Sequence, residues 1–354
     1  MCMKPVLFDM DGKHATRRQI LAHLGRMGAV GAMGTGLSLV PMVQTCAGEL
    51  VDFIEGPPVA DIPPIQLSKH VWMVPAKDAF PTPENHGMMA NILFVVTGKG
   101  VVVVDTGASL QIGQMALRMI KKVTPQPVVA VFNSHFHGDH WLGNHAFVAA
   151  LGPQLPIYSL PYTTEQIQGH EGDLWRSLME RWTNQGSTGT KVTAPNRATQ
   201  HGAEFRFGNV TLKMHHYGQA HTKGDLTVEV VEDKVFHVGD LAMENRIANI
   251  DDGSYPGTFK YFDTLQKAGG PDALFVPCHG NARKDLLQTY GTFLKGIWEP
   301  SLAAVKAEIP IGQAKALVLK DPRVAARAPT MEGFEANIGK YTSLAYLEAE
   351  KEFF

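Results

Sequence analysis

The feature that most limits what this chain can fold into is the run SHFHGDH at residues 134–140. It holds three histidines and one aspartate within six positions, and it follows an apolar run at 128–132 that predicts a buried strand. Neutral imidazoles and ionised carboxylates are good ligands for zinc-like ions. The run therefore predicts a metal-binding loop at the end of a strand, and a solvent-exposed histidine-rich tract is the alternative.

Composition excludes some classes of function. The chain has 354 residues, of which 44% are hydrophobic, so it can bury one large core or two modest ones. Its 32 basic and 34 acidic residues nearly balance, and no basic stripe is visible along the sequence. A nucleic-acid partner is therefore not expected, and a small-molecule substrate is.

The amino-terminal segment predicts export. Arg17 and Arg18 precede a glycine-rich apolar run at 27–40, which is too short and too rich in glycine for a stable membrane helix. Small residues at 45–47 suit cleavage of a signal. We therefore interpret residues 1–47 as a twin-arginine export signal of a periplasmic protein, with no stable membrane span in the mature chain. An ordinary amphipathic helix and a signal kept as a membrane anchor are the alternatives.

The hydrophobic pattern predicts strands followed by helices, twice along the chain. Residues 48–67 are rich in proline and acidic residues and predict an extended lead-in. Strands are predicted at 70–74, 91–96, 100–105, 128–132, 204–207, 210–216, 226–231, 235–238 and 273–276. Helices are predicted at 110–122, 161–182, 258–268 and from 285 onward, with breaks at Pro300, Pro310, Pro322 and Pro329. Two stacked sheets with helices on their outer faces fit this order.

Three later strand ends carry further metal-ligating residues. His221, Asp240 and His279 each follow a predicted strand, and loops at strand ends are where sites are usually built. With the loop at 134–140 they make five histidines and two aspartates, enough for two ions that share a carboxylate.

The HFHGDH motif together with His221, Asp240 and His279 resembles the metallo-β-lactamase-fold hydrolase superfamily over about residues 68–296. The resemblance implies an α/β (α+β) fold, a four-layer αββα sandwich with the site at one edge between the sheets. We expect residues 68–296 to form this catalytic domain. Residues 297–354 are then a helical carboxy-terminal extension packed on the same domain.

The resemblance also implies how the site is assembled. His135, His137 and His221 would hold one metal, Asp139, His140 and His279 would hold the second, and Asp240 would bridge them. Asp105 would support the histidine-rich loop without binding metal. Nitrogen and oxygen ligands with a histidine at position 137 favour two Zn²⁺ per chain, although iron and manganese also suit such a site.

The implied chemistry is hydrolysis by a water that the two ions share, with Asp139 and Asp240 as the catalytic carboxylates. A bridging Asp240 favours a thioester, a lactone or a similar small ester, as in glyoxalase II-like relatives. In the segment 85–90 and in its export signal, the chain is similar to exported relatives associated with sulfur oxidation and with periplasmic quinoprotein dehydrogenase systems. The alternatives are a β-lactamase, a phosphodiesterase, and a non-catalytic metal-binding or iron redox accessory protein of a periplasmic oxidation system. The oligomeric state does not follow from the sequence.

Other residues near the motif are weaker candidates. His86, Met88, Trp141 and Asn144 are predicted to line the substrate pocket because they adjoin the metal-binding loop or an expected flap. Cys278 is expected to be a small core residue whose side chain points away from the site. Glu244 and Arg246 face either substrate or solvent, and the sequence does not decide between these.

Overall fold

The computed structural model describes residues 54–77, 79–247 and 250–353. The predicted export signal at 1–47 lies outside these residues. Residues 54–64 of the predicted lead-in form neither helix nor strand. Among the described helices, none combines the length and apolar character that crossing a bilayer requires.

The first sheet has seven strands in the order of the sequence. They are β1 (Ile65–Gln66), β2 (Val71–Val74), β3 (Ile92–Thr97), β4 (Gly100–Val104), β5 (Val128–Phe132), β6 (Ile157–Ser159) and β7 (Arg197–Ala198). Strands β1 to β4 pair antiparallel, and β4 to β7 pair parallel. The parallel strands β4 to β7 therefore all end at the same edge of the sheet, and the loops that follow them can meet there.

The second sheet has five strands in the order β12-β11-β10-β9-β8. They are β8 (Glu204–Phe207), β9 (Val210–His215), β10 (Thr227–Val230), β11 (Val235–Gly239) and β12 (Leu274–Pro277). Only the β11–β12 pair is parallel, and α7 (Tyr255–Gly269) makes the crossover between these two strands.

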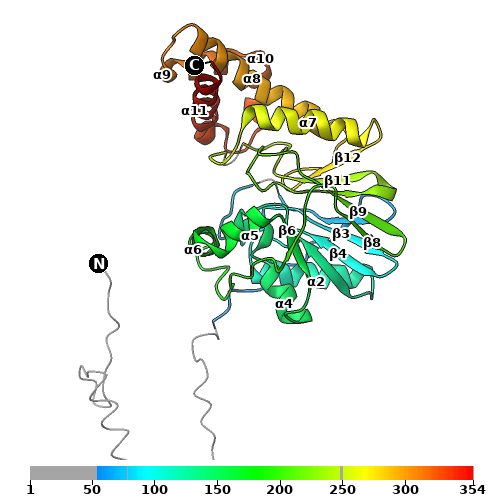
Figure 1. Ribbon diagram of the computed structural model, residues 1–354. Helices are drawn as coiled ribbons and strands as arrows, with labels where there is room; N and C mark the ends of the chain where they lie inside the picture. Colours follow the sequence, from blue (N-terminus) through cyan, green and yellow to red (C-terminus); the bar gives the residue numbers. More distant parts are fainter. Residues whose placement is uncertain (1–53, 78, 248–249, 354) are drawn as a thin grey trace, which may run out of the picture. The chain divides into compact units, whose positions relative to one another are not determined.

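Helices cover the outer faces of both sheets (Figure 1). Over the first sheet and its edge lie α2 (Leu110–Val123), α3 (Gly138–Trp141), α4 (Asn144–Leu151), α5 (Pro161–Gln168) and α6 (His170–Trp182). Beyond the second sheet lie α7, α8 (Leu286–Lys306), α9 (Ile311–Lys320), α10 (Pro322–Ala325) and α11 (Phe334–Phe353). Two 3₁₀ turns, η1 (Val231–Asp233) and η2 (Ala328–Thr330), complete the described elements.

Helices α2 and α7 are each preceded by a capping serine, Ser109 and Ser254, whose side chain accepts a hydrogen bond from a backbone N–H of the first turn.

The alternation of side chains along the strands separates three apolar cores. In β3, Leu93 and Val95 face the second sheet, whereas Ile92 and Phe94 face α2. The inter-sheet core thus lies between the two sheets, and a second core lies between the first sheet and its helices. Together with the core beyond the second sheet, this gives the four layers that the sequence predicts.

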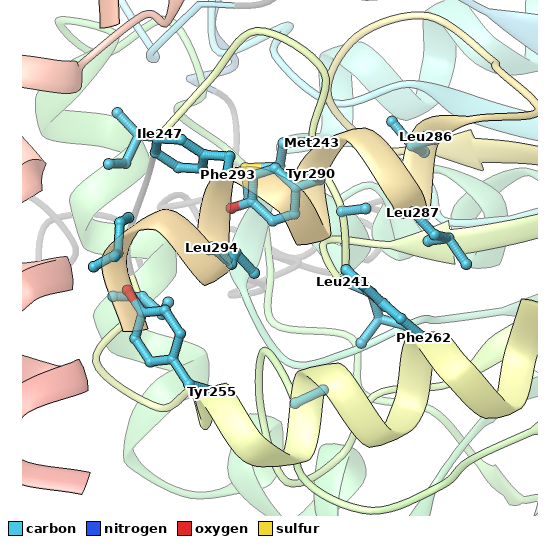
Figure 2. Packing of buried hydrophobic residues seen from close by; sticks show 14 of the residues in the cluster. Leu241, Met243, Ile247, Tyr255, Phe262, Leu286, Leu287, Tyr290, Phe293 and Leu294 are labelled. Atoms are coloured by element: carbon cyan, nitrogen blue, oxygen red, sulfur yellow. The ribbon is translucent and has the colours of Figure 1, made fainter. Parts of the chain in front are cut away.

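The third core joins the second sheet to the carboxy-terminal helices. Figure 2 shows its residues on the loop after β11, on α7 and on α8, with Phe262 of α7 near Leu287 of α8. Phe334, Ile338 and Tyr341 of α11 belong to the same buried cluster. The extension therefore shares a core with the sandwich.

Three sequence expectations about elements need correction. Helix α8 continues through Pro300, because its buried residues on both sides, Ile297 and Ser301, keep packing against the following helices. The expected boundary after residue 296 consequently falls inside a helix. The predicted helix at 161–182 is two helices that meet at Gly169, and α4 was not predicted at all.

A buried carboxylate connects the two sheets. Asp233, at the end of η1, accepts hydrogen bonds from the Ser68 hydroxyl and, at 2.8 Å, from the backbone N–H of His70. Its other oxygen lies 2.7 Å from His70 Nδ1, and His70 Nε2 in turn accepts from Asn209 at 3.1 Å. Burial alone would raise the pKa of Asp233, but the hydrogen bonds from Ser68 and His70 hold it below its usual value.

This contact predicts an acid-sensitive contribution to stability. The folded-state pKa of Asp233 is lower than that of the unfolded chain, so its stabilisation is present above about pH 4 and is lost as the pH falls through the folded-state pKa. We expect Asp233→Asn to lower the free energy of unfolding by about 2 kcal/mol at pH 7. Urea denaturation at several pH values should show that difference shrinking below about pH 4. The exposed Asp272→Asn is the control, and an equal loss at all pH values would contradict the prediction.

Candidate metal centre

Loops at strand ends bring the predicted ligands together from both sheets. The loop after β5 and the first turn of α3 carry His135, His137, Asp139 and His140. The loop after β9 carries His221, Asp240 directly follows β11, and His279 lies two residues after β12. All seven side chains are buried, with exposed fractions of 8% or less. The structure thus places in one region residues that are up to 144 positions apart, from 135 to 279.

These seven residues form two adjoining groups. In one group, ligand atoms of His135, His137, His221 and Asp240 all lie within 4.8 Å of one another, and in the other those of Asp139, His140 and His279 do so. Asp240 reaches both groups: its Oδ2 lies 3.7 Å from His221 Nε2 and 3.3 Å from His279 Nε2. Its Oδ1 lies 3.6 Å from His140 Nε2. The carboxylate is therefore placed where the sequence predicts a bridge.

Hydrogen bonds on the outer side of the rings decide which nitrogen faces inward. His135 Nδ1 lies 3.0 Å from the Ser134 hydroxyl, and His140 Nδ1 lies 3.1 Å from Asp105 Oδ2. His279 Nδ1 donates to the carbonyl of Met89 at 2.8 Å. In these three rings the outer hydrogen bond fixes a hydrogen on Nδ1, so Nε2 is the nitrogen that is left to face a metal.

His137 is turned the other way. Its Nε2 lies 3.4 Å from Asp252 Oδ2, and its Nδ1 lies 3.0 Å from His221 Nε2. Asp252 holds the ring with Nδ1 inward, so this carboxylate at the mouth of the site selects the nitrogen that can bind a metal.

The inward atoms fit bound cations. In this tautomer His279 Nε2 is an acceptor, yet it lies 3.3 Å from the acceptor oxygens of both Asp139 and Asp240. Within the described residues, His135 Nε2, His140 Nε2 and Asp240 Oδ1 are buried without a hydrogen-bond partner. Acceptors that face acceptors in a buried site need a cation or a proton between them. This donor set of imidazoles and carboxylates matches the ligands of zinc-like ions.

The pKa values reflect this crowding. Burial, together with the neighbouring His137, lowers the pKa of His221 to about 3. Burial also opposes a charge on His140, but Asp139 and Asp240 raise its pKa well above the usual value. The pKa of Asp240 is held well below its usual range by His279 and His140, against the effect of burial. The carboxylates are therefore ionised at neutral pH, as metal binding requires.

Asp105 supports the histidine-rich loop, as the resemblance implies. It is fully buried, and its φ of 58° is in the left-handed region, which Asp and Asn tolerate better than most residues. Its carboxylate accepts from Ser134 N at 2.8 Å, from Ser134 Oγ at 2.7 Å and from His140 Nδ1. Gly143 lies against the backbone next to Asp105. A Cβ at position 143 would lie 2.0 Å from the carbonyl oxygen of Thr106, so a residue with a side chain does not fit there.

Cys278 is buried but does not pack as an apolar core residue. Its Sγ lies 3.2 Å from Asp105 Oδ2 and 3.3 Å from His237 Nε2. The Cys278 side chain does point away from that of His279, as the sequence predicts. It points toward the polar groups of Asp105 and His237 beneath the site. The thiol therefore belongs to the support of the Asp105 carboxylate.

Sequence reasoning also missed the residue that shapes the His221 loop. Asp225 accepts from the backbone N–H groups of His221 and Thr222, both at 2.8 Å, and from the Thr222 hydroxyl at 2.7 Å. Burial raises the pKa of Asp225 to about 7, although these hydrogen bonds lower it. The signal for this loop is the run Thr222-Lys223-Gly224-Asp225, in which an aspartate follows a turn.

A cavity of about 640 Å³ opens above the two groups of ligands. His137, Asp139, His221, Asp240 and His279 form its floor. Helix α6 provides Leu174, Trp175, Leu178 and Trp182, and the segment 80–89 provides Phe80, Pro81 and Met89. Charged residues also line it, namely Glu171, Arg246, Asp251, Asp252 and Lys340. The cavity thus combines an apolar wall with a polar floor, as substrate sites usually do.

The structure does not place the four predicted pocket residues on this cavity. Trp141 and Asn144 are fully buried, and they hydrogen-bond to Phe136 O and to Asn133, respectively. Met88 packs in the core between the first sheet and its helices. His86 lines a separate hollow beside Gln185 and Gly186. Adjacency to a ligand in sequence was misleading because neighbouring side chains point in different directions.

Arg246 and Glu244, which the sequence left undecided, have different surroundings. Arg246 is 3% exposed and lines the cavity. Glu244 instead accepts hydrogen bonds from Asn281 and forms an ion pair with Arg283 at 3.2 Å.

Comparisons with known proteins agree with this fold. The family model of the metallo-beta-lactamase superfamily matches residues 87–288. A solved metallo-beta-lactamase from Pontibacter korlensis superposes with a TM-score of 0.50 at 21% identity, covering 64% of this chain and 94% of that one. A double mutant of the sec-alkyl sulfatase PisA1 superposes with a TM-score of 0.63 at 16% identity, covering 83% of this chain. These likenesses show a shared fold.

One curated protein matches over a short segment. The linear primary-alkylsulfatase of Pseudomonas sp. (strain ATCC 19151) is 37% identical over 51 residues, which are 14% of this chain and 10% of that protein. This chain also spans only 51% of the length of the sec-alkyl sulfatase. The superfamily match, by contrast, extends over more than half of this chain and includes all seven predicted ligands. The chain therefore belongs to the metallo-beta-lactamase superfamily.

Proposed function

We propose that this chain is an exported dinuclear zinc hydrolase that cleaves a thioester, a lactone or a similar small ester. The observation that carries the proposal is the position of Asp240 between two groups of inward-facing ligands on the floor of a cavity. His135, His137 and His221 would hold one ion, and Asp139, His140 and His279 would hold the other. When bound, two such cations lower the pKa of a shared water and polarise the bond that is broken.

Asp139 is placed to move the proton. Its Oδ2 lies 3.3 Å from both His140 Nε2 and His279 Nε2, and its side chain lines the cavity floor. A carboxylate at this point can accept a proton from the attacking water and return it to the leaving oxygen or sulfur. Addition of water across the ester bond then yields the acid and the alcohol or thiol, and no protein nucleophile is needed.

Location and subfamily are part of the proposal. The twin-arginine pattern at Arg17 and Arg18 supports export to the periplasm in a folded, metal-loaded state. Asp240 supports placement beside exported glyoxalase II-like hydrolases. Cell fractionation tests the location, and recovery of the protein only in the cytoplasm would overturn it.

A sulfate ester of an apolar alcohol is the second candidate substrate. It is favoured by the 51-residue match to a linear primary-alkylsulfatase and by the apolar wall that α6 contributes to the cavity.

A hydrolysis screen with metal analysis tests the function. The purified mature chain should contain about two zinc ions, and chelation should abolish hydrolysis that added zinc restores. The screen should include thioesters, lactones, alkyl sulfates, β-lactams and phosphodiesters. Turnover of only the last two would favour the alternative enzymes. Stoichiometric iron with visible absorbance and no turnover would favour an accessory redox protein and would refute the hydrolase.

A further inference from the structure

Arg246 is a buried cation that has no anionic partner among the residues that the structure describes. It follows β11 by seven residues, is 3% exposed and lines the cavity beside His279. Its guanidinium lies 4.3 Å from the centre of the Phe80 ring, and its Nη1 donates to the carbonyl of Ala79 at 3.1 Å. Across the described residues, no carboxylate forms an ion pair with it, and its Nε has no hydrogen-bond partner.

The contact with His279 does not satisfy the guanidinium. Arg246 Nη1 lies 3.0 Å from His279 Nδ1, but that nitrogen carries the hydrogen that it donates to Met89 O. Two donors cannot bond to each other, so of the five N–H groups of Arg246 only one has an acceptor in the described part of the chain. The Phe80 ring offsets part of the cost of burying the charge, but it accepts no in-plane hydrogen bond.

A guanidinium cannot lose its charge in a protein, and buried charges are almost always paired. Arg246 therefore needs an anion that the described residues do not supply. We propose that Arg246 binds an anionic group of the substrate, either a sulfate or a carboxylate, on or near the bond that is hydrolysed. The inference rests on the proposed function and names the class of substrate.

The other charges in the cavity direct the anion to this point. Glu171, Asp251 and Asp252 line the same cavity and repel an anion at its mouth. Lys340, the other basic lining residue, is 56% exposed at its side chain and forms an ion pair with Asp251 at 3.4 Å. Arg246 is thus the basic side chain of the cavity that is both buried and free of an ion pair.

The apolar wall defines the rest of the substrate. Leu174, Trp175, Leu178 and Trp182 of α6 line the cavity, and Leu174 remains 37% exposed. A hydrocarbon or aromatic arm would cover this surface. The substrate class is therefore an amphiphilic ester, with an apolar arm on α6 and an anionic group on Arg246.

Calorimetric titration of the metal-loaded full chain with matched probes tests the subsite. n-Octanesulfonate and n-octanoate carry the anion and cannot be hydrolysed as esters, whereas n-octanol has the same arm without charge. We expect Arg246→Gln to weaken binding of the two anions by roughly 10- to 100-fold and to leave octanol binding unchanged. Tighter binding of the sulfonate than of octanoate would indicate a sulfate ester, and the reverse would indicate a carboxylate.

Lys340→Gln is the matched control, because it removes the same charge from the exposed rim of the same cavity. It should weaken anion binding less than about threefold. Metal content is measured for every variant, and Arg246→Lys, which keeps the charge, should retain a preference for the sulfonate over octanol. Equal binding of sulfonate and octanol by the unmodified protein, or an unchanged preference in Arg246→Gln, would overturn the proposal. The titration needs no turnover, so failure of every ester in the screen would refute the function and leave the subsite standing.

Discussion

If the proposed function is right, replacing Asp240 by alanine is expected to reduce kcat/KM by on the order of 10³-fold or more and to release at least one of the two proposed metals. The physical reason is that the two oxygens of this carboxylate face imidazoles of both ligand groups. Removing the side chain therefore removes a negative charge that both groups share. The five buried histidines would then keep Asp139 as the one carboxylate among the predicted metal ligands. Steady-state kinetics together with elemental analysis of the purified variant provide the measurement.

The matched control for this substitution is Asp251→Asn, at the edge of the same cavity. Asp251 forms an ion pair with the exposed Lys340 and is not within either ligand group, so metal content should stay at the level of the unmodified protein. If Asp240→Ala retained both metals and its activity, the bridging role would be wrong.

Asp105→Asn should have the largest effect on stability. Asparagine tolerates the left-handed backbone at this position, so the change isolates the loss of the charged acceptor. Its amide NH₂ would face the Ser134, His140 and Cys278 groups that now approach the carboxylate. We expect the free energy of unfolding to fall by about 3 kcal/mol and metal affinity to fall about 10- to 100-fold.

Denaturation of the metal-free and metal-loaded forms separates these two effects. The loss in the metal-free form reports the buried hydrogen bonds, and any further loss in the loaded form reports the metal affinity. Asp173→Asn on α6 is the control, since that side chain is 81% exposed and should change neither quantity. Unchanged stability of the metal-free Asp105→Asn protein would contradict the supporting role.

The fold was largely predictable because its strands are short apolar runs whose alternation is visible in the sequence. The run at 128–132 is the strand β5 itself, and the run at 204–207 is β8. Helix α4 was missed because Asn144 and His145 at its start give no apolar periodicity. Pro300 was expected to end a helix, and only the packing of α8 against α11 and α9 shows why it does not.

The floor of the cavity was predictable because histidines and aspartates, which are common metal ligands, follow several of the predicted strands. His221, Asp240 and His279 lie within a few residues after a run that predicts a strand. The cavity wall was not predictable, because α6 is remote in sequence from the motifs that drew attention to His86 and Trp141. The significance of Arg246 depends on which groups fail to pair with it, and only a three-dimensional arrangement reveals that.

The carboxy-terminal helices add a consequence for how such enzymes diverge. Asn337 and Lys340 of α11 line the cavity, yet neither belongs to a group of metal ligands. Helix α6 likewise contributes only to the wall. Because the floor with the predicted metal ligands and the rim are built by different segments, substitutions on α6 or α11 can alter which molecules enter the cavity while the floor stays intact. The selectivity of the cavity can therefore change through side chains of its wall while the predicted metal ligands of its floor are kept.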